Sequence, residues 1–346
     1  MIGRRSVVQG LGAAIGTIGV SAPLAVAAAH AQPRGVASVI RGVYAAPGLS
    51  FSAIFLADRL GLWAKHGVGT ELKQVQGGPL SMAALTNREA NFAGVASTDP
   101  IVGWERGIKT LAIGAFTGSL AMQFTARNDW MTRLGVSPRS PLGDKLKAFK
   151  GARIGASTIG GGPAQYTRYL ARTNGIDPER DMKILAVGFG AARMAALRTN
   201  QVDVTVGDAP EADQIEMEGF GGLFLNCAHE VPIFQEFPYT VALVTPAFAN
   251  EQPEVVRGIA HALGDANDMF HTKFGEVVDV LKRQFASVPG KAIERALERD
   301  QGSYPGGCRM TRKMWENNIA VSLEAKMIAS SLSAQEGEMW TNRFIA

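Results

Sequence analysis

Three segments of the sequence join small and hydroxyl-bearing residues to the expected start of a helix. They span residues 44–51, 94–100 and 155–163. A serine or threonine at a helix start satisfies free backbone N–H groups, and a glycine lets a ligand approach the backbone. Because these N–H groups and the helix dipole attract negative charge, such turns suit a carboxylate, a sulfonate or a phosphonate.

Each of these segments also has a purely structural explanation. Ser97 and Thr98 before Asp99 and Pro100 form an ordinary helix cap, because proline suits the first helical turn. The three glycines at 160–162 serve equally well as a flexible turn. A binding role is favoured because the three segments fall in two halves of the chain, whose strand ends would face one cleft.

Acidic side chains could also reach this cleft. Asp208 comes two residues after the strand expected at 202–206, and Glu211 begins the next expected helix. Asp208 either points into the cleft or is a solvated turn carboxylate. If Asp99, Asp208 and Glu211 all reached the cleft, the ligand would need a cationic or hydrogen-bond-donating part.

The sequence lacks the patterns of common cofactor and metal sites, so neither is expected. The segment 188–193 faintly resembles a dinucleotide-binding loop, but it lacks the third glycine and a suitably placed acidic residue. There is no G-x-S-x-G nucleophile elbow, and the five histidines form no HxxxH or HxH pair. No run of Lys and Arg with interleaved aromatic residues occurs, which argues against nucleic acid as a partner.

Cys227 and Cys308 are the only cysteines. Two cysteines without a CxxC motif exclude the usual redox and zinc sites. In an oxidising compartment the two would form a disulfide if the fold brought them together, and otherwise they remain separate buried thiols.

The spacing of apolar residues predicts two similar runs of alternating strands and helices. In the first run, strands are expected at 36–44, 70–75, 90–95 and 110–115, and helices at 51–60, 62–66, 79–86 and 99–106. In the second run, strands are expected at 122–127, 152–156, 182–187, 202–206 and 222–226, and helices at 141–151, 164–174, 190–199 and 211–217. A strand at 239–245 follows, and 253–285 and the segment from 311 to the end are expected to be helical.

Two such runs indicate two α/β lobes, each with a mostly parallel sheet flanked by helices. We place the crossovers between them near 121–124 and 237–240, where hinge strands would join the lobes. Lobe one then comprises residues 34–122 and 239–346, including the C-terminal helices, and lobe two comprises residues 123–238.

The start of the chain has the features of an export signal. Arg4 and Arg5 precede a Gly- and Ala-rich apolar stretch at 10–29, which ends at a small-x-small site at 29–31. These features predict a cleaved signal peptide of the twin-arginine type at 1–31 and a mature protein in the periplasm. The alternative is a retained membrane anchor, but Gly and Ala partition weakly into lipid. Cleavage would lower the formal net charge from +4 to +2, because the segment holds two arginines and no acidic residue.

Taken together, several short motifs resemble the periplasmic substrate-binding proteins for nitrate, taurine, sulfonate and thiamine-pyrimidine import. The motifs are Tyr44-Ala45-Ala46-Pro47-Gly48, Gly61-Leu62-Trp63-Ala64-Lys65-His66-Gly67, Ala83-Ala84-Leu85, Arg153-Ile154-Gly155 after residues 146–151, and Ala195-Ala196-Leu197 before Gln201-Val202-Asp203-Val204. Asn200 stands where this family usually has glycine. Each motif is weak alone, and the resemblance runs from about residue 38 to about residue 260.

The resemblance implies a two-lobed, hinged receptor of an ABC importer with the type II periplasmic-binding-protein fold and no enzymatic activity. Such a receptor binds a small organic anion or related nutrient of the sulfonate, taurine, nitrate or pyrimidine class between its lobes. Its expected partners are this solute, a membrane permease and the twin-arginine export machinery, and it is expected to be a monomer. The candidate ligand-binding residues are Ser50, Phe51, Gly78, Ser97, Thr98, Asp99, Ser157, Thr158, Gly160, Gly161 and Asp208.

Some proteins on the same scaffold are enzymes, namely a thiamine-pyrimidine synthase and a cysteine-dependent desulfinase. The cysteine- and histidine-rich run of the synthase is absent here, and the early cysteine of the desulfinase has no counterpart. An exported or cytoplasmic enzyme of this kind is the alternative interpretation.

Overall fold

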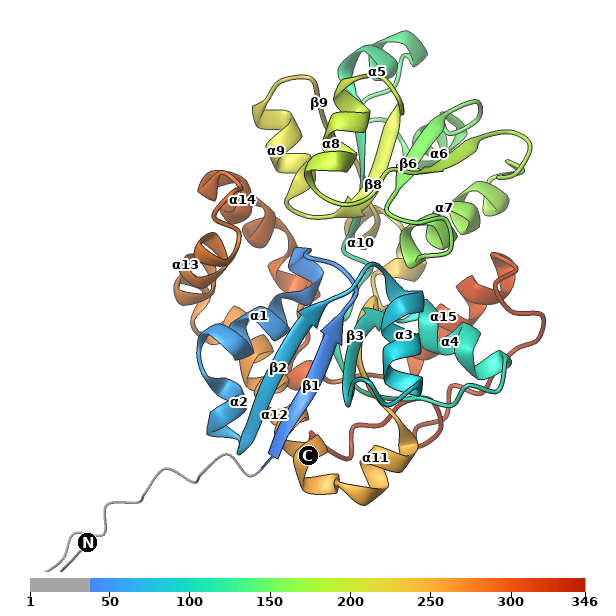
Figure 1. Cartoon of the computed structure of the whole chain (residues 1–346). Helices are drawn as coiled ribbons and strands as arrows, with labels where there is room; N and C mark the ends of the chain where they lie inside the picture. The colour runs from blue at the N-terminus through green and yellow to red at the C-terminus, as the bar shows by residue number, and fades with distance from the viewer. Residues whose placement is uncertain (1–37, 346) are drawn as a thin grey trace, which may run out of the picture. The chain divides into compact units, whose positions relative to one another are not determined.

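The computed structural model describes residues 38–345 and contains two five-stranded sheets flanked by helices (Figure 1). The first sheet has the order β2-β1-β3-β10-β4, with β1 (Ser38–Tyr44), β2 (Val68–Gln74), β3 (Phe92–Ala96), β4 (Leu111–Thr117) and β10 (Thr240–Val244). The second sheet has the order β7-β6-β8-β5-β9, with β5 (Met122–Arg127), β6 (Arg153–Ala156), β7 (Lys183–Ala186), β8 (Val204–Asp208) and β9 (Gly221–Asn226).

Helices connect the strands and follow the last of them. Up to β4 they are η1 (Leu49–Phe51, a 3₁₀ helix), α1 (Ser52–Arg59), α2 (Leu62–Lys65), α3 (Gly78–Thr86) and α4 (Thr98–Glu105). Between β5 and β10 they are α5 (Asn128–Leu134), α6 (Leu142–Lys147), α7 (Gly162–Thr173), α8 (Ala191–Arg198), α9 (Glu211–Met217), α10 (Cys227–Glu230) and η2 (Pro232–Phe234). After β10 they are α11 (Pro246–Glu251), α12 (Pro253–Thr272), α13 (Phe274–Gln284), α14 (Gly290–Asp300), η3 (Gln301–Ser303), η4 (Gly306–Cys308) and α15 (Arg312–Glu324).

The first sheet separates two apolar cores, because successive side chains of a strand point to opposite faces. In β10, Ala242 and Val244 belong to the core that holds α1, α12 and α13. Val241 and Leu243 belong to the core that holds α3 and α4, where Trp315 of α15 is fully buried. The continuous apolar run of this strand therefore follows from burial on both faces.

The second sheet is covered in the same way. The larger of its two cores holds Phe124 of β5, Phe224 of β9 and Phe149, which follows α6. The ring centroids of Phe124 and Phe149 lie 4.9 Å apart. A smaller core holds Leu197 of α8 and Ile215 of α9. Helices on both faces of each sheet give the α/β architecture expected from the sequence.

Each sheet contains one strand that runs against the others. β10 pairs antiparallel with both β3 and β4, and β5 pairs antiparallel with both β8 and β9. The pairs of β1 with β2 and β3, and of β6 with β7 and β8, are parallel. The reversed strands are the two that the chain enters directly from the other sheet, after the connections at 118–121 and 227–239.

The C-terminal part differs from the expected helix running from residue 311 to the end. α15 ends at Glu324, and residues 325–345 contain turns and bends but no helix. This segment lies along the edge strand β4, where the Ala112 N–H donates to the Met339 carbonyl at 2.8 Å and the Thr341 N–H donates to the Ala112 carbonyl at 2.9 Å. Met339 and Trp340 are buried against the first sheet. The helical interpretation was wrong here because these apolar residues pack an extended segment.

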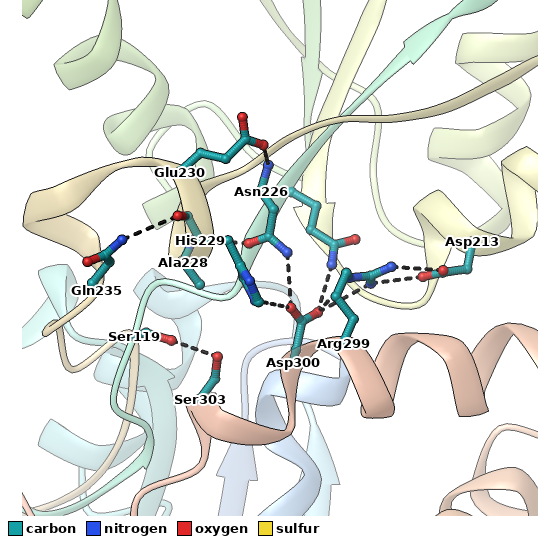
Figure 2. A network of polar contacts seen from close by, with 11 residues as sticks. Ser119, Asp213, Asn226, Ala228, His229, Glu230, Gln235, Arg299, Asp300 and Ser303 are labelled. Atoms are coloured by element: carbon teal, nitrogen blue, oxygen red, sulfur yellow. Dashed lines mark hydrogen bonds and ion pairs between the residues drawn. The ribbon is translucent and has the colours of Figure 1, made fainter. Parts of the chain in front are cut away.

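A buried polar network joins the end of α14 to the second sheet (Figure 2). The side chain of Asp300 is 5% exposed, and its carboxylate has four side-chain partners. They are Gln123 of β5 at 2.9 Å, Asn226 of β9 at 3.0 Å, His229 of α10 at 3.1 Å and Arg299 of α14 at 3.2 Å. Arg299 also donates to both carboxylate oxygens of Asp213 in α9, at 2.8 and 2.9 Å. A buried charge is stable only when it has such partners. Because the partners of Asp300 lie on β5, β9 and α10, the network holds the end of α14 against the second sheet.

Cys227 and Cys308 are buried and unpaired, which matches the simpler of the two interpretations of the cysteines. Within residues 38–345, no helix has the length and apolar character needed to cross a membrane. The signal predicted at 1–31 lies outside the described residues.

Candidate functional site

A cavity of about 550 Å³ opens between the carboxyl ends of strands from both sheets. Its wall is formed largely by the turns that follow β1, β2, β3, β6, β7 and β8. Open α/β sheets bind ligands at the carboxyl ends of their strands, and this volume is typical of a small-molecule site. We call this cavity the cleft and take it as the candidate site.

The structure places seven of the eleven predicted residues in the wall of the cleft: Phe51, Gly78, Asp99, Ser157, Thr158, Gly161 and Asp208. The other four are not part of the wall. Ser50, Ser97 and Thr98 are buried, and Gly160 is exposed. The hydroxyl of Ser97 accepts a hydrogen bond from Asn318 of α15 at 2.7 Å, so it holds protein elements together.

Asp208 ends β8 and joins the two sides of the cleft. Its Oδ2 accepts a hydrogen bond from the Ser50 hydroxyl at 2.6 Å, and its Oδ1 accepts one from the Tyr239 hydroxyl at 2.5 Å. Nearby, the Leu49 N–H donates to the Ala209 carbonyl at 3.2 Å. Burial raises the pKa of the Asp208 carboxyl, and the bonds from Ser50 and Tyr239 oppose that rise. Of the two positions considered for Asp208, the structure has the one in the cleft.

Asp99 lies in the first turn of α4, and its carboxylate rests against the start of α3. A Cβ on Gly78, the first residue of α3, would lie 1.9 Å from Asp99 Oδ2, so this contact requires glycine. Burial raises the pKa of Asp99 to about 7, and a backbone hydrogen bond at Ala96 opposes the rise. Within residues 38–345 no basic side chain acts on this pKa, so the Asp99 carboxyl lines the cleft without a cationic partner from that part of the chain.

The glycine-rich turn before α7 brings hydrogen-bond donors to the cleft. Thr158 Oγ1 is buried and has no partner among the described residues. A Cβ on Gly161 would lie 2.6 Å from this oxygen, so glycine allows the close contact. α7 has 12 residues, with Gly161 at its N-cap and Pro163 in its first turn. The positive end of this helix and the free hydroxyl suit a hydrogen-bond acceptor or anionic group of a ligand.

Two arginines line the cleft, and both are bound to carboxylates. Arg193 of α8 donates to the two oxygens of Glu211 at 2.7 and 2.5 Å and to the Val206 carbonyl at 3.0 Å. Arg198, on the same helix, forms an ion pair with Glu218. These pairs hold α8 against neighbouring segments and neutralise the two guanidinium groups.

The cleft wall also contains Arg193, Phe189, Tyr239 and Phe285, which were not predicted from the sequence. A signal for the first two was available, because the turn at 188–193 has the same glycine-rich, strand-to-helix character as the three predicted segments. Excluding a dinucleotide there did not exclude another ligand. Tyr239 precedes β10 and Phe285 follows α13, so neither lies at the carboxyl end of a parallel strand.

The two sheets, their strand orders and the cleft between them define the type II periplasmic-binding-protein fold. The chain belongs to the NMT1-like family, whose model matches residues 47–280. No curated protein matches the chain in sequence.

Solved structures share the fold at low sequence identity. A protein of Bordetella bronchiseptica RB50 aligns with a TM-score of 0.72 and 16% identity, over 89% of this chain and 95% of that chain. The alkanesulfonate-binding protein SsuA from Xanthomonas axonopodis pv. citri, bound to MOPS, gives 0.65 and 16%, over 84% and 94%. The periplasmic nitrate-binding protein NrtA from Synechocystis PCC 6803 gives 0.66 and 14%, over 84% and 81%. The enzyme DSZB also has this fold, so the fold alone does not separate receptors from enzymes.

Proposed function

We propose that the protein is the solute receptor of an ABC importer and binds a small organic anion or related nutrient, of the sulfonate, taurine, nitrate or pyrimidine class, in the cleft. The observation that carries the proposal is the convergence of polar groups from both sheets on one cavity. Asp99 comes from the first sheet, and Thr158 and Asp208 come from the second. A ligand held from both sides stabilises the closed arrangement, because it makes more contacts there.

Hinge closure is the proposed mechanism. The chain passes between the sheets at 118–121 and 227–239, and we propose lobes of 34–122 with 239–346 and of 123–238 as the moving bodies. The bonds from Ser50 to Asp208 and from Leu49 to Ala209 cross the cleft. Opening would break these bonds and admit solvent, and closing on a ligand would restore them.

Calorimetry combined with mass spectrometry tests the receptor against the enzyme alternative. The protein lacking residues 1–31 should bind one ligand per chain, and the ligand should be recovered unchanged. Cys227 and Cys308 are buried and are not part of the cleft wall, so neither supplies a thiolate nucleophile there. Turnover of the bound ligand without a partner protein would reject the receptor proposal in favour of an enzyme.

The location and partners belong to the same proposal. The receptor would be exported by the twin-arginine machinery, act as a monomer in the periplasm and deliver its ligand to a membrane permease. Replacing both Arg4 and Arg5 with lysine should leave the protein in the cytoplasm with residues 1–31 attached, because the export receptor reads paired guanidinium groups. Fractionation and N-terminal sequencing measure the outcome, and normal periplasmic recovery of a form starting near Gln32 would contradict the twin-arginine assignment.

A further inference from the structure

The charged side chains in the wall of the cleft are mainly acidic. The wall has four carboxylates and two guanidinium groups, so its net charge is −2 when all of them are ionised. The groups are Asp99, Asp208, Glu211, Glu218, Arg193 and Arg198. A concave site of one sign of charge concentrates ligands of the opposite sign.

Neither arginine is free to hold an anionic ligand. The Nε and one terminal nitrogen of Arg193 bind Glu211, and the other terminal nitrogen binds the Val206 carbonyl. Arg198 is paired with Glu218. Because a carboxylate already occupies the bidentate edge of Arg193, the charges that remain unbalanced are those of Asp99 and Asp208.

Asp99 occupies a position where an anion would otherwise bind. Its carboxylate lies against Gly78, at the N-terminus of the nine-residue helix α3. Helix N-termini attract anions, and here the protein supplies the anion itself. When Asp99 is ionised, a ligand group beside it must therefore donate hydrogen bonds rather than accept them.

We propose that the ligand of the cleft carries a cationic N–H group, an ammonium or an amidinium, and that Asp99 and Asp208 accept its hydrogen bonds. This inference rests on the proposed receptor function and narrows its ligand class. Within that class it selects amine-bearing solutes such as taurine, and it excludes nitrate and simple alkanesulfonates.

The rest of the wall suits the remainder of such a ligand. Phe51, Phe189 and Phe285 line the cleft, and aromatic faces attract cations. A sulfonate or carboxylate at the far end of the ligand would have the Thr158 hydroxyl and the start of α7 as donors. A zwitterion with separated charges therefore matches the cleft better than a simple anion.

Calorimetric titration with matched probes tests the inference. Taurine and isethionate share an ethanesulfonate body and differ in an amine against a hydroxyl. Benzamidine and benzenesulfonate share a ring and differ in the sign of charge. We expect taurine and benzamidine to bind at least about tenfold more tightly than their partners, because only they carry a charged donor. Nitrate should give no heat of binding.

The variant Asp99→Asn keeps the shape of the side chain and removes its charge. The Kd of taurine and of benzamidine should rise about tenfold or more, while that of isethionate should not rise, because it has no charged donor for Asp99 to bind. Asp144→Asn is the matched control, because Asp144 lies on α6 with its side chain 56% exposed and is not part of the cleft wall. Circular dichroism confirms that both variants are folded.

Proton release gives a second measurement that a merely structural Asp99 would not affect. The pKa of Asp99 is about 7, so a bound cation should favour the ionised form and release a proton near neutral pH. Titration in two buffers of different ionisation enthalpy counts that proton, and Asp99→Asn should abolish the release. The ionisable group that interacts with Asp99 is Tyr166 of α7, whose pKa is raised by burial. The other ionisable side chains of the cleft wall are Asp208, Glu211, Glu218, Tyr239, Arg193 and Arg198.

Each outcome decides the inference separately from the receptor proposal. Tighter binding of isethionate, benzenesulfonate or nitrate, or unchanged affinity in Asp99→Asn, overturns the inference and leaves the receptor proposal standing. If no probe binds at millimolar concentration, the inference also fails. Native mass spectrometry of the protein as purified from its own periplasm then shows whether any solute is bound, which tests the receptor proposal independently.

Discussion

Replacing Asp300 with asparagine is expected to lower the free energy of unfolding by about 3 kcal/mol or more. The carboxylate is almost fully buried and binds Gln123. It also binds Asn226, His229 and Arg299 (Figure 2). Removing one partner of a buried charge leaves the other uncompensated. The amide NH₂ of asparagine would also face NH₂ groups that need an acceptor.

Asp129→Asn is the matched control for this variant, because it too removes a carboxylate bound to an arginine. Asp129 pairs with Arg127 at 2.7 Å, but its side chain is 56% exposed. Exposed pairs contribute about 0–1 kcal/mol, so the control should have a small effect. Urea unfolding followed by circular dichroism compares the two, and equal losses would mean that the Asp300 network stabilises the fold no more than a surface pair.

The pH dependence of unfolding gives a further check on the same network. The hydrogen bond to Asp300 raises the pKa of His229 above its ordinary value. The stability gained from a raised histidine pKa is fully present below the pKa of the unfolded chain, about 6.5, and is lost as pH rises through the folded pKa. The urea midpoint of the wild type should therefore fall above about pH 6.5, and Asp300→Asn should show a smaller fall.

Replacing Gly78 with alanine is expected to weaken binding of benzamidine by about 10- to 100-fold. The new Cβ would lie 1.9 Å from Asp99 Oδ2 and 2.3 Å from its Cγ, so the carboxylate must leave its position. Loss of one hydrogen bond to a charged group costs about 1.5–3 kcal/mol, which corresponds to this range of affinity. Calorimetry on the purified variant measures the change.

Gly275→Ala is the matched control for this substitution. Gly275 is the second residue of α13, and a Cβ there would meet nothing within 4 Å. Alanine favours a helix more than glycine does, so this variant should keep its affinity and be slightly more stable. Wild-type affinity in Gly78→Ala would show that the position of Asp99 is not required for binding.

The order of elements could be predicted from the sequence because each strand and helix has its own apolar pattern. The strand at 239–245 is one example, since β10 (Thr240–Val244) is buried on both faces and reads as a continuous apolar run. Its antiparallel direction could not be predicted, because it depends on partners more than one hundred residues earlier in the chain. The C-terminal segment was mistaken for helix because Met339 and Trp340 are buried by the first sheet and not by a helix face.

Residues of the cleft wall were predicted only where local sequence determines their position. The turns before α4 and α7 identify Asp99, Thr158 and Gly161, because a strand end followed by a helix start places them at the edge of a sheet. Whether a hydroxyl points into the cleft or into the protein interior depends on residues far away in the sequence. Ser97 is an example, because its hydroxyl binds Asn318 of α15. The ion pair of Arg193 with Glu211 likewise depends on the packing of α8 against the start of α9, and this packing cannot be predicted from either segment alone.

The reversed strand of the first sheet has a consequence for the order of folding during synthesis. All five strands of the second sheet lie between Met122 and Asn226, whereas the first sheet needs β10, which ends at Val244 and separates β3 from β4. The part of the protein that leaves the ribosome first is therefore the last whose sheet can close. A nascent chain paused before residue 240 would carry a complete second sheet beside an unfilled gap in the first, and the exposed apolar edges of that gap are what a chaperone would have to cover.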